Sequence, residues 1–153
     1  MRLIRWSPCV AFIAMVVAVL LPPMAVGVSL YDGSYIGTIE CDQIPRYTSA
    51  PLKREFTLKI ADGRAQYERR LVLPPTRLLP TDVDPIERGA GTVSSTGAVS
   101  LTGEAGDLTG GYEATYRGQI DGQLLRLSGV QVWQLPDQAN YKRSCTIAVS
   151  RSE

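Results

Sequence analysis

The feature that most constrains the fold of this chain is an alternation of apolar and polar residues with a period of two. Successive side chains of a β-strand point to opposite faces of the sheet, so this alternation predicts strands with one buried face. Residues 54–61 (REFTLKIA) show it clearly, with Phe56, Leu58 and Ile60 on one face. After residue 28, no stretch keeps an apolar repeat of 3.6 residues for three turns. The sequence therefore predicts an all-β protein.

Tight turns separate the predicted strands. Asp62-Gly63 and Asp121-Gly122 are pairs favoured in two-residue hairpins, and Ser95-Thr96-Gly97 predicts a third turn. Together the alternation and the turns predict eight strands in one antiparallel meander. They cover residues 34–41, 54–61, 64–72, the two arms of 89–103, 111–120, 123–133 and 144–150.

Two longer segments interrupt the strand pattern. Residues 73–88 (LPPTRLLPTDVDPIER) contain four prolines, which a central strand does not tolerate. Residues 134–143 (QLPDQANYKR) are polar and predict a second loop. Neither segment has the composition of a flexible linker, so we expect one domain with two loops at its rim.

The first residues have the pattern of a secretory signal peptide. Arg2 and Arg5 precede the short apolar run 10–21, and Ala25-Val26-Gly27 offers small residues at the cleavage positions. The apolar run is shorter than the roughly 20 residues that span a bilayer, which argues against an uncleaved anchor. We predict a signal peptide of residues 1–27, with cleavage after Ala25 as the alternative. Residues 28–153 then form a single β domain that is periplasmic or secreted and is not inserted in the membrane.

Two cysteines remain after cleavage, Cys41 in the first predicted strand and Cys145 in the last. An even number of cysteines in an exported protein predicts a disulfide, with buried free thiols as the alternative. Because a disulfide requires Cα atoms within about 7 Å, the first and last strands should lie close together. This favours a closed up-and-down barrel of about eight strands. A β-sandwich bridged between its sheets is the alternative.

Composition excludes several functions. The chain has no histidine, which rules out Ser–His–Asp and Cys–His catalysis and imidazole metal sites. A net charge of +1 gives no reason to expect nucleic acid as a partner, and we expect no metal or cofactor. The remaining acid–base groups are carboxylates at outward or turn positions. A cell-envelope hydrolase with paired carboxylates is therefore only a third hypothesis. The carboxylates considered are Glu40, Glu68, Glu113 and Asp121.

Aromatic residues on the predicted inner faces suggest a binding function. They could line the mouth of the barrel and hold a small amphipathic molecule, or they could simply fill the core. Arg69 shares the face of Tyr67, where it could meet an anionic ligand or, at a strand end, reach solvent. Our first hypothesis is a non-enzymatic binding protein. Its inward aromatic residues are Tyr35, Tyr67, Tyr112, Tyr116 and Trp133.

A second hypothesis concerns a protein partner. Long loops on rigid β scaffolds often carry binding residues, and Arg77, Leu78 and Leu79 lie at the centre of the proline-rich segment 73–88. The segment could bind an envelope protein, as an interaction or inhibitor module would. Alternatively, it could be a structural crossover that covers one end of the barrel.

Several glycine-rich motifs resemble those of small exported bacterial β-proteins of uncharacterised function. They are DGSYIGTIEC, with its G-x-Y-x-G opening, TVSSTGAVSLTG and YRGQIDGQLLRLSG, followed by a final strand with cysteine. In architecture the chain is also similar to the periplasmic inhibitors of lysozyme or of metalloproteases, which are small one-disulfide barrels. The resemblance implies an exported single-domain β-protein and supplies no active-site residues.

Overall fold

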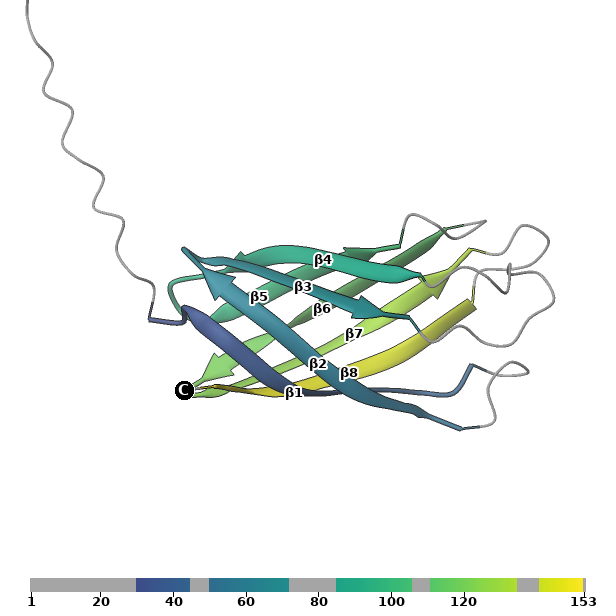
Figure 1. The fold of residues 1–153 in the computed structure, drawn as a ribbon, viewed down its shortest axis with the longest axis horizontal. Helices are drawn as coiled ribbons and strands as arrows, with labels where there is room; N and C mark the ends of the chain where they lie inside the picture. Colours follow the sequence, from purple (N-terminus) through teal and green to yellow (C-terminus); the bar gives the residue numbers. More distant parts are fainter. Residues whose placement is uncertain (1–29, 45–49, 72–84, 106–110, 135–140, 153) are drawn as a thin grey trace, which may run out of the picture.

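The computed structural model describes residues 30–44, 50–71, 85–105, 111–134 and 141–152. Eight antiparallel strands follow one another around a closed barrel, and β8 pairs with β1 (Figure 1). The prediction of an all-β, eight-stranded up-and-down barrel is confirmed, and the sandwich alternative is wrong. The strands are β1 (Gly33–Cys41), β2 (Leu52–Ala61), β3 (Arg64–Arg70), β4 (Ile86–Val93), β5 (Ala98–Glu104), β6 (Tyr112–Asp121), β7 (Leu124–Trp133) and β8 (Tyr141–Arg151).

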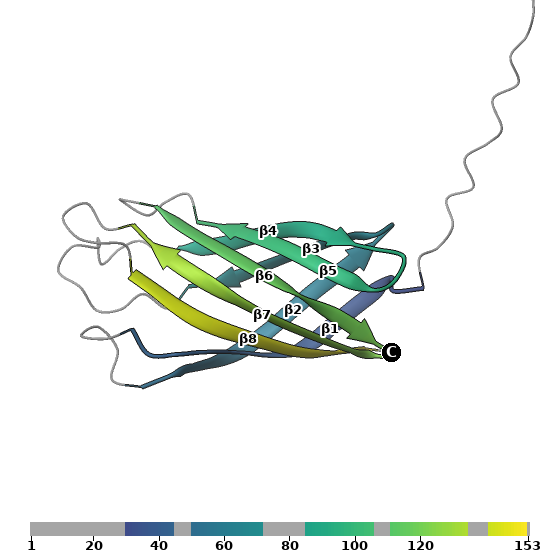
Figure 2. The same ribbon diagram turned by 180° about the vertical axis from the view of Figure 1, so that it is seen from behind.

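The barrel has two different ends. The tight turns after β2, β4 and β6 lie at one end, which we call the turn end, and the C-terminus lies there too (Figures 1 and 2). At the other end, the loop end, β1, β3, β5 and β7 finish and β2, β4, β6 and β8 begin. Asp62 and Gly63 both have positive φ, 52° and 71°, as the predicted Asp-Gly hairpin requires.

The disulfide between Cys41 and Cys145 joins β1 to β8 where the barrel closes. The two residues are direct cross-strand partners, and their Cα atoms are 4.0 Å apart. They are separated by 104 residues in the chain, so the bond links the first strand covalently to the last. The predicted disulfide is confirmed, and its position explains why the sheet has no free edge.

Buried side chains line the barrel interior. Alternating residues of each strand are buried, as the period-two pattern predicts, and the apolar ones form a continuous core. The half of the barrel near the turn end is apolar. Its buried residues include Leu58, Ile60, Ala65, Val99, Leu101, Ile120, Leu125, Leu127, Ile147 and Val149.

Two predicted loop boundaries are wrong. β4 begins at Ile86, so Ile86, Glu87 and Arg88 belong to a strand and not to the proline-rich segment 73–88. β8 begins at Tyr141, which moves the last residues of the predicted loop 134–143 into that strand. In both places the alternation of buried and exposed residues continues through charged residues, and Glu87 and Arg143 are buried inside the barrel.

Several expectations fall outside the described residues. They concern the signal peptide 1–27 and the centre of the proline-rich segment, Arg77, Leu78 and Leu79. Within the ranges that the structure describes, no helix is long and apolar enough to cross a membrane.

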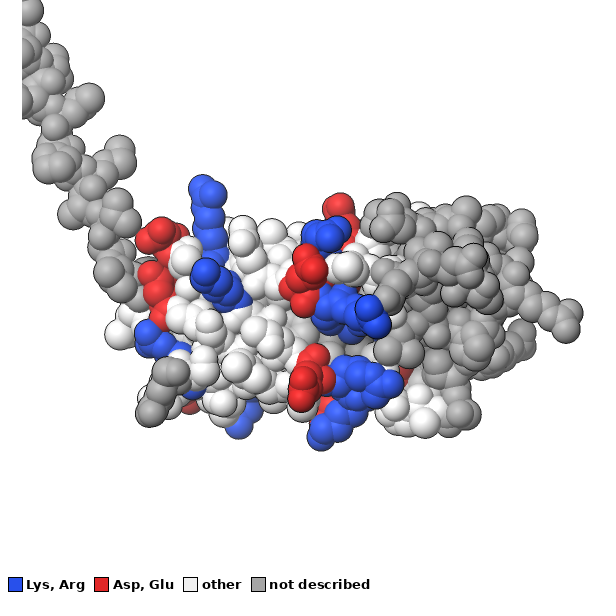
Figure 3. All heavy atoms as spheres, viewed as in Figure 1, with Lys and Arg blue, Asp and Glu red and all other residues white. Residues whose placement is uncertain are grey.

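Charged side chains on the face seen in Figure 3 lie in two groups, one towards the turn end and one next to the loop end, and both groups mix acidic and basic residues. Two cross-strand ion pairs lie on the outside of the barrel, Glu40 with Lys53 and Glu68 with Arg88. Glu113 and Asp121 are exposed as well, so the outward placement of these carboxylates is confirmed. The mixed charges on this face give it no single sign.

Candidate functional site: a buried polar cluster at the loop end

Glycine residues make room for a large side chain inside the barrel. Tyr67 on β3 lies opposite Gly89 on β4, which in turn pairs with Gly103 on β5. A Cβ atom at Gly89 would lie 1.9 Å from Tyr67 Cε1, and one at Gly103 would lie 2.2 Å from the Tyr67 hydroxyl oxygen. The Tyr67 ring therefore lies flat across β4 and β5, which brings its hydroxyl to the side chain of Glu87.

Glu87 is a fully buried carboxylate with several partners. The Tyr67 hydroxyl donates a hydrogen bond to Oε1 over 2.5 Å, and the Tyr112 hydroxyl donates to Oε2 over 2.9 Å. The Arg69 guanidinium forms an ion pair with Oε2 at 2.5 Å, and the Tyr116 hydroxyl lies 3.5 Å from Oε1. A charge this deeply buried is stable only when it is paired and hydrogen-bonded, and both conditions are met here.

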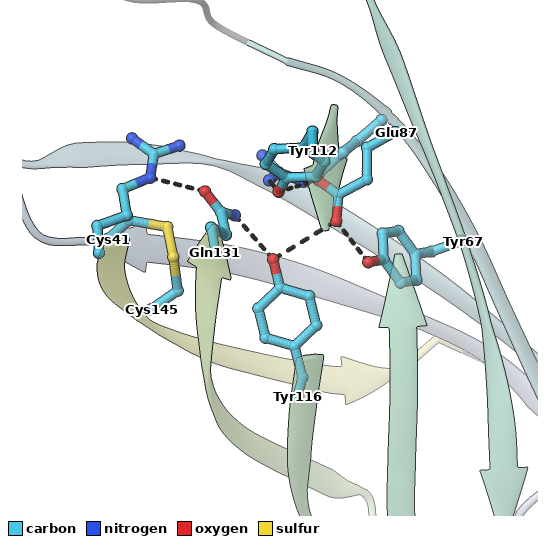
Figure 4. Close-up of a disulfide and its surroundings, with 9 residues drawn as sticks. Cys41, Tyr67, Glu87, Tyr112, Tyr116, Gln131 and Cys145 are labelled. Carbon is cyan, nitrogen blue, oxygen red and sulfur yellow. Dashed lines mark hydrogen bonds and ion pairs between the residues drawn. A yellow bond between two sulfur atoms is a disulfide. The ribbon is translucent and has the colours of Figure 1, made fainter. Parts of the chain in front are cut away.

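A chain of hydrogen bonds continues from Glu87 across the barrel. Gln131 Nε2 donates to the Tyr116 hydroxyl over 2.7 Å, and Arg143 Nε donates to Gln131 Oε1 over 2.6 Å. Gln131 and Arg143 are direct partners on β7 and β8. Figure 4 shows the line of bonds from Gln131 through Tyr116 to Glu87 and Tyr67, beside the disulfide. Residues from five strands are thus joined in one network.

Aromatic rings complete the site. The Tyr112 and Trp133 ring centroids are 4.6 Å apart, with the rings inclined at 64°. The Arg143 guanidinium carbon lies 5.8 Å from the centroid of the Trp133 ring, a cation–π distance. We call the whole set the polar cluster. It comprises Tyr67, Arg69, Glu87, Tyr112, Tyr116, Gln131, Trp133 and Arg143.

The polar cluster lies towards the loop end of the barrel. Arg69 is one residue from the end of β3, Tyr112 begins β6, and Trp133 ends β7. The apolar half of the interior separates it from the turn end. A molecule that reached the cluster would therefore enter from the loop end.

Burial sets the protonation states of the cluster. Burial, and then the negative charge of Glu87, raise the pKa of the phenols of Tyr67 and Tyr112, and the same two causes raise the pKa of Tyr116. These hydroxyls stay neutral and keep their protons for hydrogen bonding. Burial, the largest single influence, by itself would lower the pKa of Arg69, but Glu87 and the three nearby tyrosines together outweigh it, so the pKa of Arg69 is raised. Burial lowers the pKa of Arg143, which has no such carboxylate partner among the described residues.

Three buried donor atoms in the cluster have no hydrogen-bond partner among the described residues. They are Arg69 Nε, Trp133 Nε1 and Arg143 Nη2. Trp133 is 3% and Arg143 4% exposed, and the Arg69 side chain is 7% exposed. Native proteins pair most of their buried polar groups, so each exception needs an explanation. All three atoms donate, so what the cluster lacks is an acceptor.

The structure brings together five of the six inward residues proposed for ligand binding. Tyr67, Tyr112, Tyr116, Trp133 and Arg69 are all members of the polar cluster. Tyr35 is not: it is buried near the turn end, where its hydroxyl donates to the Tyr31 carbonyl over 3.0 Å. Tyr35 lies near the start of the first strand and Tyr112 at the start of the sixth, so the alternating strand directions of the predicted meander could have placed them at opposite ends.

Three functional candidates were missed. Glu87, Gln131 and Arg143 are the buried polar residues of the described ranges. Gln131 lies two residues before the inward Trp133, and Arg143 lies two residues before Cys145. Glu87 lies four residues before Gly91, which the alternation also places on an inner face, so extending the alternation would have found all three. The prolines of 73–88 and the polar composition of 134–143 instead predict loops at Glu87 and Arg143.

The arrangement offers binding groups and little catalytic chemistry. Glu87 is the only buried carboxylate of the described ranges, and its oxygens are occupied by Tyr67, Tyr112 and Arg69. Within those ranges, no group of three or more Cys, Asp or Glu residues could hold a metal ion.

Comparison of the chain with protein-family models, with curated proteins and with solved structures found no match.

Proposed function

We propose that this protein is an exported, non-enzymatic binding module that holds a small amphipathic molecule at the loop end of its barrel. The observation that carries the proposal is the set of three buried donors, Arg69 Nε, Trp133 Nε1 and Arg143 Nη2, that lack acceptors. Leaving a buried donor unsatisfied costs about 1–3 kcal/mol. A ligand that supplies acceptors would recover part of that free energy.

The surroundings of these donors support the proposal. Sites for small molecules are mostly apolar or aromatic and contain a few precisely placed polar groups. Here the rings of Tyr112 and Trp133 pack together next to the Arg143 guanidinium. They can contact the apolar part of a ligand while the donors bind its polar part. The apolar half of the barrel, near the turn end, restricts such a ligand to the region near the loop end.

The proposal that the protein is not an enzyme rests on the state of Glu87. A general base or nucleophile needs a free lone pair that faces the substrate. Glu87 accepts hydrogen bonds from two tyrosines and pairs with Arg69, so its lone pairs are directed at the protein itself. The chain has no histidine that could take this role. The disulfide and the predicted signal peptide support export, because disulfides persist in oxidising compartments.

Trp133 provides a direct test. The chain has two tryptophans, and the other, Trp6, lies within the predicted signal peptide. Titration with a panel of envelope metabolites should change the fluorescence of the cleaved protein and raise its melting temperature for the molecules that bind. The variant Trp133→Phe should lose the fluorescence change but still show thermal stabilisation. If no compound of a broad panel alters either signal, the proposal is wrong.

A further inference from the structure

The charges inside the barrel do not balance. The polar cluster contains two guanidinium groups, Arg69 and Arg143, and one carboxylate, Glu87. Glu87 neutralises Arg69, with which it forms the 2.5 Å ion pair. Among the residues that the structure describes, Arg143 is left with one uncompensated positive charge. Buried charges in proteins are normally paired, because moving an isolated charge out of water costs several kcal/mol.

The partners of Arg143 among the described residues are all neutral. Its Nε donates to the amide oxygen of Gln131, and its guanidinium lies beside the Trp133 ring. Its Nη2 has no acceptor among the described residues. The position next to Arg143 therefore favours an anion.

The positions of two unused donors in the fold agree with the charge. Arg143 and Trp133 lie on the neighbouring strands β8 and β7, and Arg143 is the direct partner of Gln131, two residues before Trp133. Both side chains are buried, and each has an unused N–H group. A carboxylate has two oxygens and accepts from two donors at once, whereas an alcohol or an ether provides a single oxygen.

We infer that the ligand of the loop end carries a carboxylate, which Arg143 and Trp133 receive through Nη2–H and Nε1–H while the apolar body of the ligand contacts the aromatic rings. This inference rests on the proposed function and specifies the chemical class of its ligand. One negative charge balances the one uncompensated positive charge of the cluster. A phosphate monoester, with about 1.5–2 negative charges near neutral pH, would leave the site with a net negative charge.

Three probes with the same eight-carbon chain separate charge from hydrophobicity: octanoate, 1-octanol and octyl phosphate. Calorimetric titration of the protein should give a dissociation constant for octanoate about 10- to 100-fold lower than that for 1-octanol, since a hydrogen bond to a charged group contributes about 1.5–3 kcal/mol. Octyl phosphate should bind more weakly than octanoate. Thermal stabilisation of the wild-type protein should follow the same order, and this measurement needs no variant.

The variant Arg143→Met should remove most of the preference for octanoate and leave the affinity for 1-octanol within a few fold. Arg126→Met is the matched control, because Arg126 lies on β7 and is exposed on the outside of the barrel. This control removes the same charge and should keep the preference. Trp133→Phe removes the Nε1–H donor and no charge, and it should reduce the preference for octanoate over 1-octanol.

The outcomes distinguish the two proposals. If octanoate and 1-octanol bind with equal affinity, or if octyl phosphate binds best, the carboxylate assignment is wrong while the proposed binding function stands. If Arg126→Met loses the preference as fully as Arg143→Met does, the anion is not held at Arg143 and the inference is also wrong. If no compound binds here or in the metabolite panel, the proposed function itself fails.

Discussion

Arg69 and Glu87 are direct cross-strand partners on β3 and β4, and their side chains form an ion pair inside the barrel. The next step of the same ladder pairs Glu68 with Arg88, whose side chains form an ion pair of 3.1 Å on the outside. The same two strands thus hold two ion pairs of the same chemistry, one buried and one exposed to water. The contribution of the buried pair to stability can therefore be measured against that of the exposed pair.

We expect Glu87→Gln to destabilise the protein by about 3–5 kcal/mol, because it leaves the Arg69 charge buried without a partner. The control Glu68→Gln breaks the exposed pair and should cost about 0–1 kcal/mol. The free energy of unfolding from urea denaturation, followed by circular dichroism, gives both values. A difference of less than about 1 kcal/mol between the two variants would show that the buried pair is not a structural requirement.

Gly89 should be intolerant of a methyl group because the Tyr67 ring occupies the position of its Cβ atom. Gly89→Ala should cost about 1–3 kcal/mol through overpacking. In a Tyr67→Ala background the space is free, so the same substitution should cost much less. The wild type, the two single variants and the double variant form a double-mutant cycle, measured by urea denaturation. If Gly89→Ala costs as much in the Tyr67→Ala background as in the wild type, the contact between Gly89 and the Tyr67 ring is contradicted.

The disulfide should make a large contribution to stability because it closes a loop of 104 residues. The chain-entropy model gives about 4–5 kcal/mol for a loop of this length. The double variant Cys41→Ser/Cys145→Ser should lose stability of that order, and reduction of the wild-type protein should have a similar effect. Two titratable thiols in the unreduced protein would contradict the bond.

The buried tyrosines predict a loss of stability at alkaline pH. The phenols of the unfolded chain release their protons near pH 10, whereas Tyr67, Tyr112 and Tyr116 have raised pKa values in the folded state and keep theirs. Below pH 10 both states are protonated and the phenols have no effect on stability. Above pH 10 unfolding releases protons, so stability falls as the pH rises.

Absorbance at 295 nm, which reports phenolate, checks this prediction. These three tyrosines should ionise only when the circular dichroism signal of the barrel is lost. In the variant Tyr116→Phe, one phenol fewer should ionise in that cooperative step. Ionisation of all tyrosines while the circular dichroism signal is intact would contradict the burial of the cluster.

The sequence by itself determined the secondary structure and the way the barrel closes. Alternation with a period of two fixed the inward residues of most strands, as with Phe56, Leu58 and Ile60, because the geometry of a strand is local. The Asp-Gly turns fixed the hairpins for the same reason. Cys41 and Cys145 added the one long-range constraint that a sequence can state directly, a covalent bond between its first and last strands.

Only the tertiary structure decided which inward residues meet. Register between strands places Glu87 against Arg69, and no local pattern encodes which residues of two strands lie opposite each other. The prolines of 73–88 and the polar residues of 134–143 predict loops at Glu87 and Arg143, and a charge inside a barrel is costly unless a partner from another strand compensates it. That partner becomes visible only when the barrel is closed.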